Sequence, residues 1–326
     1  MVAKPRIAIA IGDPAGIGPE IAIKASLSRK VRNICDPVLV GDYEVLARYA
    51  HTLRKPTPEN IVDVGAINVN FLTPGESDSA CGRAIIEYAS KAVDLAEAGD
   101  IDAVVACPQT QSSIKAAGIE FDGYPSWLAR RTGTNPDDVF MMLVSDRFRI
   151  AHVTLHLGIR NALDIIDTAR IFRVLNATNG VLQRIGIERP RVAVSGINPH
   201  ASEDGLFGLE EAEIILPAIE KARAAGIDAN GPFGADTMYL DKNFDAYVVM
   251  YHDQGHIPAK LVGFDGTAAF AIGTPLLFSS VAHGSALDIA GRGKANANAL
   301  IWAITQISGA STDPQPLDRD VERNGP

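Results

Sequence analysis

The stretch RIAIAIGDPAGIGPEIAIKASL, residues 6–27, sets the pattern of the whole chain. Its first half is a short apolar run, which predicts a buried strand, and its second half, from residue 18, has the pattern of a helix. Similar apolar runs, such as DPVLVGD at residues 36–42 and DAYVVMYH at residues 245–252, alternate with helical patterns along the sequence. Because strands that alternate with helices form βαβ units, we expect an α/β fold built on a parallel sheet.

Length and charge narrow the class of protein. The chain has 326 residues, more than one hydrophobic core usually spans, so we expect two lobes. A net charge of -9 and a pI near 5.3 argue against a nucleic-acid partner. No stretch approaches the roughly 20 apolar residues of a spanning helix, and the N-terminus lacks the features of a secretion signal. We therefore expect a soluble, cytoplasmic protein without a membrane partner.

Six of the seven histidines lie between residues 152 and 283, and three of them end apolar runs. These three are His152, His200 and His252. A parallel sheet gathers its ligands beyond the carboxyl ends of its strands, so the three imidazoles are expected to meet there. Neutral imidazoles suit a divalent metal, zinc first, although magnesium, manganese, cobalt or iron also fit. The alternative is that each histidine is a packed or capping residue.

Residues 281–300, VAHGSALDIAGRGKANANAL, form a second candidate site. Loops this rich in glycine admit a flat ligand close to the backbone, and an acidic residue such as Asp288 can accept the hydroxyls of an adenosine ribose. Because Asp288 would repel a 2'-phosphate, the pattern favours NAD over NADP. A simple loop without a ligand fits the pattern equally well. The candidate cofactor-binding residues are His283, Gly284, Ser285, Ala286, Asp288 and Asn296.

The turn AIGDPAGIGPE at residues 10–20 is also rich in glycine. It matches neither the GxGxxG nor the Walker pattern, so it does not imply a phosphate site. A structural turn and a ligand-binding loop are equally compatible with it.

Several motifs together resemble a known family. HGSALDIAGRGKAN resembles the NAD-binding loop of isopropylmalate and isocitrate dehydrogenases. Over nearly the whole chain, GDPAGIGPE, GINPHASEDGLFGLEE, GADT, DAYVVMYHDQGHIPAK and HGSALDIAGRGKA resemble, in this order, the 4-hydroxythreonine-4-phosphate dehydrogenase family of pyridoxal phosphate biosynthesis. The resemblance implies the isocitrate/isopropylmalate dehydrogenase-like fold, with two α/β/α lobes around a central cleft. It also implies NAD(P), a divalent metal held by His152, His200 and His252, and a homodimer with its active site at the interface.

The substrate positions of the family differ in this chain. The family's His-Thr pair falls on Tyr124 and Pro125, and its Asn and Arg fall on Ala269 and Phe278, so that only Lys260 is kept. A phosphate dianion needs several charge-assisted donors, and phenylalanine cannot replace a bidentate arginine. We therefore expect an apolar wall in place of a phosphate site. The alternative is that other arginines or lysines have moved to hold the phosphate.

The stretches GYPSWLA, FMMLV, RIAHVTLH and SSVAHGSALDIAGRG resemble a branch of this family, the terephthalate cis-dihydrodiol dehydrogenases. That resemblance implies NAD-dependent oxidation of 1,2-dihydroxycyclohexa-3,5-diene-1,4-dicarboxylate, with loss of carbon dioxide, to protocatechuate. Lys260 would pair with a substrate carboxylate or relay a proton, and Asp253 would orient an imidazole or help proton transfer. The alternatives are a dehydrogenase of 4-hydroxythreonine-4-phosphate or a related phosphorylated hydroxy acid, and a non-catalytic metal-binding or nucleotide-binding relative.

The same evidence divides the chain into regions. We expect residues 1–123 and 268–310 to form a nucleotide-binding lobe, residues 124–267 to form a lobe for metal binding and dimerisation, and residues 311–326 to form a flexible tail. His156 and His256 are interpreted as structural.

Overall fold

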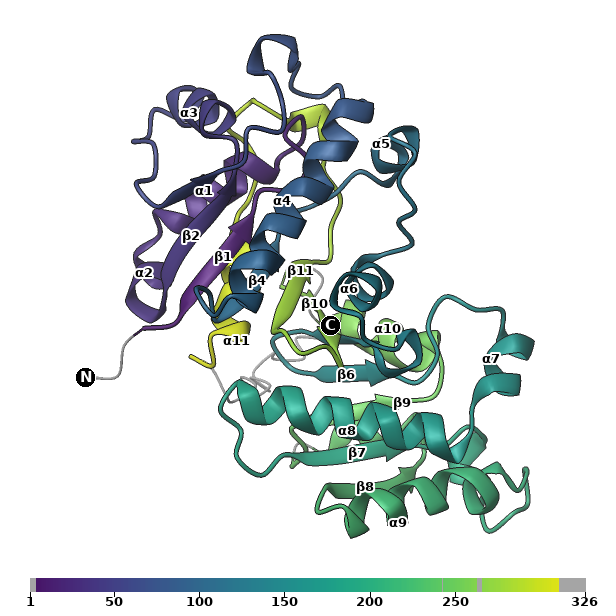
Figure 1. The fold of residues 1–326 in the computed structure, drawn as a ribbon. Coiled ribbons are helices and arrows are strands. Elements are labelled where there is room, and N and C mark those ends of the chain that lie inside the picture. Colours follow the sequence, from purple (N-terminus) through teal and green to yellow (C-terminus); the bar gives the residue numbers. More distant parts are fainter. Residues whose placement is uncertain (1–3, 242, 263–265, 311–326) are drawn as a thin grey trace, which may run out of the picture.

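The structure is a computed structural model that describes residues 4–241, 243–262 and 266–310 (Figure 1). The predicted tail, residues 311–326, lies outside the described residues. The described chain forms one large sheet with helices on both faces, which confirms the α/β class.

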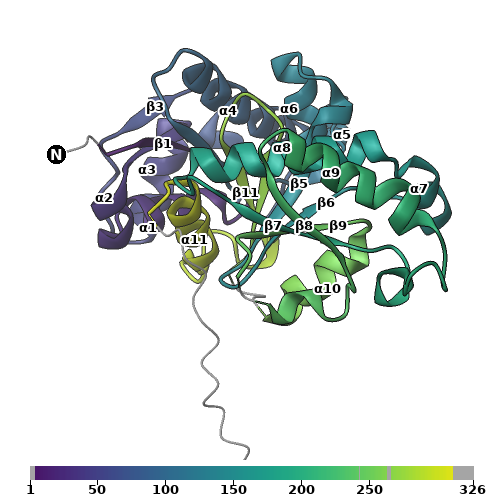
Figure 2. The ribbon, with the colours of Figure 1, turned by 90° about the horizontal axis from the view of Figure 1, so that it is seen from below.

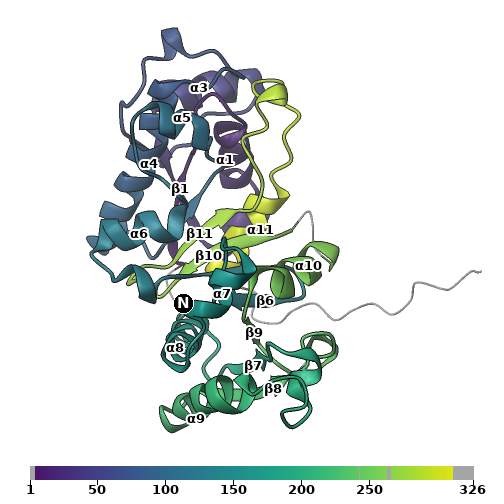
Figure 3. The same cartoon turned by 90° about the vertical axis from the view of Figure 1, so that its right-hand side faces the viewer.

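The sheet has 11 strands in the part of the chain that the structure describes. From one edge to the other they are β3 (Ile61–Asp63), β2 (Asp36–Gly41), β1 (Arg6–Ala10), β4 (Ala103–Ala106), β11 (Phe278–Val281), β10 (Ala268–Ile272), β5 (Phe140–Val144), β6 (Arg149–His152), β9 (Ala246–Val249), β7 (Arg191–Ser195) and β8 (Asp228–Phe233). Figure 3 shows β10 and β11 between the two halves of this sheet. The sheet is continuous through both predicted lobes, and their boundaries remain a prediction.

The expectation of a purely parallel sheet was wrong at its centre. Strand β10 pairs antiparallel with both β11 and β5, and β5 pairs antiparallel with β6. The connections are the reason: residues 145–148 and 273–277 are too short for a crossover helix, so each forms a hairpin. Gly273 begins the second hairpin with a φ of 89°, and a Cβ there would lie 1.9 Å from the Asp138 carbonyl oxygen.

Helices cover both faces of the sheet (Figure 2). They are α1 (Gly18–Ser26), α2 (Arg29–Ile34), α3 (Tyr43–Thr52), α4 (Ser79–Glu97), α5 (Gln111–Ala116), α6 (Tyr124–Thr132), α7 (Ile159–Ile165), α8 (Thr168–Arg184), α9 (Leu216–Ala224), α10 (His252–Val262) and α11 (Asn298–Ile307). Helices α4, α6 and α8 pack on one face, while α1, α10 and α11 pack on the other. One apolar core extends along most of the sheet.

Within the described ranges, no helix is both long enough and apolar enough to cross a membrane.

Candidate active site

The strand ends bring four histidines together. His152 is the last residue of β6, and His252 begins α10 just after β9, the parallel neighbour of β6. His256 lies one turn further along α10, where its ring stacks on that of His252 at 3.7 Å between centroids. The ring of His156 lies 5.9 Å from that of His252. Imidazoles therefore lie together at this edge of the sheet, as predicted, but the group includes His156 and His256 and lacks His200.

His152 is buried, with only 2% of its surface exposed. Its Nε2 lies 3.1 Å from His256 Nδ1, and its Nδ1 lies 3.4 Å from the Met141 carbonyl oxygen. Burial lowers the pKa of His152 to about 3 and that of His256 to about 4, so both rings are neutral. Because both nitrogens of His152 already have partners, the ring is not free to bind a ligand in this conformation.

His200 lies apart from the other three. Its exposed ring packs on Phe207 at 6.2 Å between centroids, and its Nδ1 lies 2.6 Å from Glu203 Oε1. All residues from 200 to 204 have positive φ, between 45° and 76°, although none is glycine. Left-handed backbone of this length is costly for such residues, so the segment is held in a strained turn.

The predicted metal triad is therefore not assembled within one chain. Among residues 4–241, 243–262 and 266–310, no group of three or more His, Cys, Asp or Glu side chains is close enough to hold a metal ion. His252 is the best-prepared imidazole of the set. Asp253 Oδ1 lies 2.7 Å from its Nδ1, so the carboxylate fixes the ring and leaves Nε2 available. This contact is compatible with the orienting role expected for Asp253.

A cavity of about 530 Å³ lies between α6, β10 and the end of β6. It is lined by four of the five predicted substrate residues, Tyr124, Pro125, Ala269 and Phe278, which come from distant parts of the sequence. His152 and His156 border the same cavity. The fifth predicted residue, Lys260, does not line it; Lys260 is exposed near the end of α10. The structure therefore brings the four predicted wall residues together in one cavity, but it does not place the predicted cation, Lys260, in that cavity.

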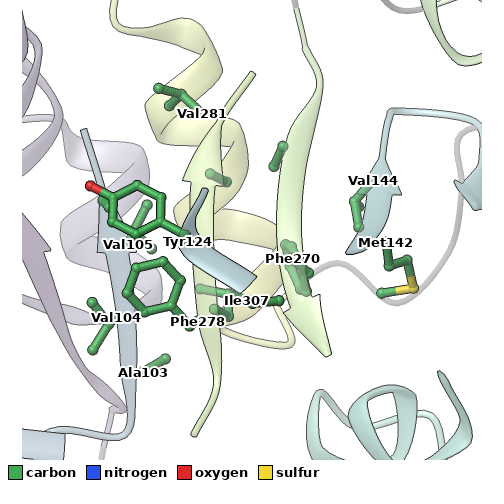
Figure 4. Packing of buried hydrophobic residues seen from close by; sticks show 14 of the residues in the cluster. Ala103, Val104, Val105, Tyr124, Met142, Val144, Phe270, Phe278, Val281 and Ile307 are labelled. Carbon is green, nitrogen blue, oxygen red and sulfur yellow. The ribbon is translucent and has the colours of Figure 1, made fainter. Parts of the chain in front are cut away.

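The wall is aromatic (Figure 4). The Tyr124 ring lies 5.0 Å from that of Phe278, 5.3 Å from that of Phe121 and 6.1 Å from that of Trp127. Figure 4 shows Tyr124 and Phe278 against Val104 and Val105 of β4. The Tyr124 hydroxyl is buried without a hydrogen-bond partner among the described residues. This part of the lining is therefore aromatic, with one unpaired hydroxyl, while polar side chains such as Gln109 and Gln111 line other parts of the cavity.

A second cavity, of about 460 Å³, borders the predicted cofactor loop. Four of the six predicted cofactor residues line it: His283, Gly284, Ala286 and Asn296. Ser285 is buried beneath the loop, and Asp288 is exposed outside the lining. Both cavities lie beside the strand pair β10–β11. Ala269 of β10 and Phe278 of β11 line the first cavity, and Ala282, just after β11, lines the second.

The glycine-rich turn at residues 10–20 supports this loop. Glu20 is fully buried and accepts hydrogen bonds from Ala295 N at 2.8 Å and Gly293 N at 3.2 Å, while Lys24 Nζ lies 2.7 Å from its carboxylate. Ile17 N donates to the Ser285 carbonyl oxygen at 3.0 Å. Of the two roles left open by the sequence, these contacts favour the structural one.

Asp13, in the same turn, extends this support to Ser285. Asp13 is fully buried and hydrogen-bonded to the Thr110 hydroxyl, which lies 2.8 Å from Ser285 Oγ. The buried carboxylates of Glu20 and Asp13 therefore both support the predicted cofactor loop.

Among the lining residues that sequence reasoning did not place in a site are His156 and Arg170. His156 had a signal, because it follows the same strand as His152 and was set aside as structural. Arg170 had none: it stands within the pattern of a surface helix, where an arginine usually makes a solvated ion pair.

The chain is also similar to known proteins. Residues 33–307 match the model of the family described as pyridoxal phosphate biosynthetic protein PdxA. The chain belongs to this family. Solved structures of the family superpose on it over nearly their whole length, which confirms that the chain has the α/β fold of this family.

Three relatives illustrate the range of substrates. The chain is 43% identical over 306 residues to a 1,2-dihydroxy-3,5-cyclohexadiene-1,4-dicarboxylate dehydrogenase of Comamonas sp., covering 93% of this chain and 96% of the relative. It is 39% identical over 321 residues to a 4-hydroxythreonine-4-phosphate dehydrogenase of Desulforapulum autotrophicum, covering 92% and 94%. A D-threonate 4-phosphate dehydrogenase of Cupriavidus necator is 38% identical over 322 residues, covering 93% and 96%.

Two solved structures show the same range. A 4-hydroxythreonine-4-phosphate dehydrogenase from Burkholderia phymatum has a TM-score of 0.84 at 35% identity, covering 94% of this chain and 98% of the other. A terephthalate 1,2-cis-dihydrodiol dehydrogenase from Burkholderia xenovorans has a TM-score of 0.75 at 41% identity, with the same coverage. The chain is therefore a dehydrogenase of this family, which oxidises an alcohol.

Proposed function

We propose that this dehydrogenase uses NAD and a divalent metal to oxidise terephthalate cis-dihydrodiol, 1,2-dihydroxycyclohexa-3,5-diene-1,4-dicarboxylate, to protocatechuate and carbon dioxide. The observation that carries the proposal is the aromatic wall at the expected substrate position. Tyr124 and Phe278 pack together there, where the resemblance expects a His-Thr pair and an arginine.

The wall suits a ring better than a phosphorylated chain. A flat, unsaturated ring gains offset or edge contacts with aromatic side chains. A phosphate dianion would need several charge-assisted donors, and among the described residues that line the cavity only Arg170 is an arginine or lysine. The 43% identity to the Comamonas cyclohexadiene dicarboxylate dehydrogenase supports the same substrate.

The proposed reaction starts at the ring carbon that carries the secondary alcohol. That carbon transfers a hydride to the nicotinamide while its hydroxyl loses a proton, which gives a ketone beside the carbon that bears the first carboxylate. The resulting β-keto acid loses carbon dioxide, and the electron pair of the broken bond enters the ring. That electron pair forms the third ring double bond and the carbonyl oxygen becomes an enolate oxygen, so the ring is already that of a catechol; protonation of this oxygen gives protocatechuate, and aromatisation drives the second step. The second carboxylate is retained.

We propose that His156, rather than His152, supplies the metal ligand from the segment after β6. His156 is exposed, lines the substrate cavity and faces His252, whereas both nitrogens of His152 have partners. A divalent metal would polarise the substrate oxygen, and zinc remains the first expectation. Because His200 does not join these imidazoles within one chain, the proposed set of metal ligands is incomplete there.

Two variants separate the candidate ligands. His156→Ala should reduce the bound metal, measured by elemental analysis of the purified protein, by at least tenfold without a large change in stability. His152→Ala should instead lower the free energy of unfolding by about 2 kcal/mol, because it opens a buried space and leaves His256 unpaired, and should retain metal. Loss of metal only in His152→Ala would contradict the assignment.

We further propose that the site closes in a homodimer. Exposed apolar side chains stand beside both separated parts of the metal set: Ile257 and Leu261 follow His252 on α10, and Leu206 follows His200. Apolar side chains gathered beside a functional site are typical of an interface. A second copy could bring the His200 segment of one chain to the His252 segment of the other. We also propose that the protein is located in the cytoplasm.

One assay tests the proposed function. NADH formation is followed with the cyclic diol dicarboxylate and with 4-hydroxythreonine-4-phosphate, each with and without a chelator. We expect oxidation of the diol, release of carbon dioxide, and loss of activity on chelation. A clear preference for the phosphorylated amino acid would contradict the interpretation of the aromatic wall, and NADH formation with neither compound would favour a non-catalytic relative.

A further inference from the structure

We infer that Arg170 binds the substrate carboxylate that the product retains, and thereby selects a ring dicarboxylate over a monocarboxylate; this inference rests on the proposed function. Arg170 lies in the first turn of α8 and lines the cavity beside Tyr124 and His156.

The guanidinium of Arg170 is held in place by the protein. Its Nε donates a hydrogen bond to the Val153 carbonyl oxygen at 2.8 Å, and its plane lies over the Phe140 ring at 5.4 Å from the centroid. The side chain is only 19% exposed. An arginine fixed through Nε and one face keeps its terminal nitrogens for another partner, in the planar arrangement that matches a carboxylate.

The charge of Arg170 is only weakly compensated. Its ion-pair partner is Asp137, at 3.6 Å between Nη1 and Oδ1, and the Asp137 side chain is 70% exposed. An ion pair this long and this solvated contributes little. A second carboxylate, Asp167, caps α8 and accepts a hydrogen bond from the Arg170 backbone N–H at 2.6 Å. The one acidic residue of the lining, Asp122, lies 3.2 Å from Arg130 and does not neutralise Arg170. Arg170 is therefore the one arginine or lysine among the described residues that line the cavity, and its exposed acidic partner leaves it able to bind an anion.

A single guanidinium matches one carboxylate. The proposed substrate has two, and the one on the reacting side must give up its negative charge as carbon dioxide leaves. A strong ion pair to that carboxylate would stabilise the starting state more than the transition state and would slow the step. The carboxylate on the far side of the ring keeps its charge throughout, so binding it to Arg170 costs the reaction nothing. The chemistry thus assigns Arg170 to the retained carboxylate.

The test compares two substrates and three variants. The substrates are the dicarboxylate diol and benzoate cis-dihydrodiol, which lacks the retained carboxylate. We expect Arg170→Gln to lower kcat/KM for the dicarboxylate by roughly 10- to 100-fold, mainly through KM, and to change kcat/KM for the monocarboxylate by less than about threefold. Arg170→Lys should fall between the wild type and Arg170→Gln, because it keeps the charge without the planar pair of donors.

Arg173→Gln is the matched control. Arg173 stands on the same helix and pairs with Asp138 at 3.3 Å, but it does not line the cavity. We expect kcat/KM for both substrates to stay within about twofold in this variant, because a solvated pair contributes little. An equal loss with both substrates in Arg170→Gln would show a structural role through Val153 and overturn the inference, as would no loss with either.

A binding experiment distinguishes a failure of this inference from a failure of the proposed function. Calorimetry with the holoenzyme should show that terephthalate binds more tightly than benzoate to the wild type, and that Arg170→Gln abolishes the difference. This result would support Arg170 as a carboxylate site even if no diol were oxidised. If inorganic phosphate displaced terephthalate at lower concentration than benzoate does, and did so only with Arg170 intact, the site would be one for phosphate and the inference would be wrong.

Discussion

Glu20 shows how one buried charge can organise a loop far away in the sequence. Its carboxylate receives the backbone N–H groups of Gly293 and Ala295 and the ammonium of Lys24, and it has no exposed surface. A buried carboxylate is tolerated only when donors of this kind surround it. The loop of residues 283–295 is therefore fixed in shape before any cofactor binds.

Replacing Glu20 tests this role. Glu20→Gln removes the charge but keeps the size, so the two N–H groups and Lys24 lose a charge-assisted acceptor. We expect the free energy of unfolding to fall by about 2 to 3 kcal/mol and dinucleotide affinity to fall with it. Urea unfolding and dinucleotide titration measure the two effects. Asp94→Asn, which removes an exposed partner of Arg131, is the control and should cost less than about 0.5 kcal/mol. Equal effects of the two variants would contradict the role of Glu20.

The three cysteine thiols give a second prediction at the scale of single residues, namely that burial suppresses their ionisation and reactivity. Cys35, Cys81 and Cys107 are all buried, and burial raises the pKa of Cys81 to about 11 and that of Cys35 to about 12. At pH 8 the thiolate fraction of Cys81 is then about one thousandth, so native protein should not react with a disulfide reagent until denaturant is added. Because the unfolded thiols ionise near 9.0 and the folded ones do not, stability should fall as pH rises from 9 toward 11. A rapidly reacting thiol in native protein would disprove this.

At the scale of elements, the packing of α6 against β11 shapes the proposed substrate cavity. Tyr124 opens α6 and packs on Phe278 of β11, so the helix is attached to the centre of the sheet by an aromatic contact. Hairpins bring β10 and β11 to that centre, between β4 and β5. Two segments about 150 residues apart in sequence thereby form one wall.

Truncating Phe278 tests this packing. Phe278→Ala removes a fully buried ring and leaves a cavity that the sheet cannot close, so we expect a loss of about 3 to 5 kcal/mol in the free energy of unfolding. Phe71→Ala, at a ring that is 86% exposed, should change it by less than about 0.5 kcal/mol. Thermal and urea unfolding measure both. A small effect at Phe278 would mean that the wall is not part of the core.

At the scale of the whole molecule, the unassembled metal set and the exposed apolar surface both motivate the proposed homodimer. Neither the separation of His200 from His252 nor the exposure of Leu261, at 79%, is expected of a complete enzyme that works as a monomer. Both would be resolved by a second copy.

A charge at the surface tests the dimer. Wild-type protein should sediment as a dimer, whereas Leu261→Glu should place a carboxylate in an apolar interface and shift the species to monomer, with loss of activity and of bound metal. Phe71→Glu, a control at an exposed ring in the other half of the chain, should leave the dimer intact. Sedimentation velocity over a range of concentrations distinguishes the two. A monomeric wild type with full metal content would refute the closure between copies.

The class of fold followed from the sequence because the period of apolar residues is a local property. Runs such as residues 6–10 and 246–249 became strands, and the family motifs placed Tyr124, Ala269 and Phe278 in one cavity. The local pattern did not predict the direction of neighbouring strands. The hairpins at residues 145–148 and 273–277 reverse the chain, so the strands that they join pair antiparallel in a sheet that was expected to be parallel.

The proposed choice of His156 over His152 rests on the tertiary structure alone. His152 and His156 have the same chemistry and lie on the same segment, so the sequence could not distinguish them. The packing of α10 against β6 distinguishes them, because it buries His152 against His256 and leaves His156 exposed, although both border the cavity. Arg170 is a similar case, since a helix pattern cannot show that its third residue faces a hollow formed by strands far away. Sequence determined which groups the protein has, and burial determined which of them can reach a ligand.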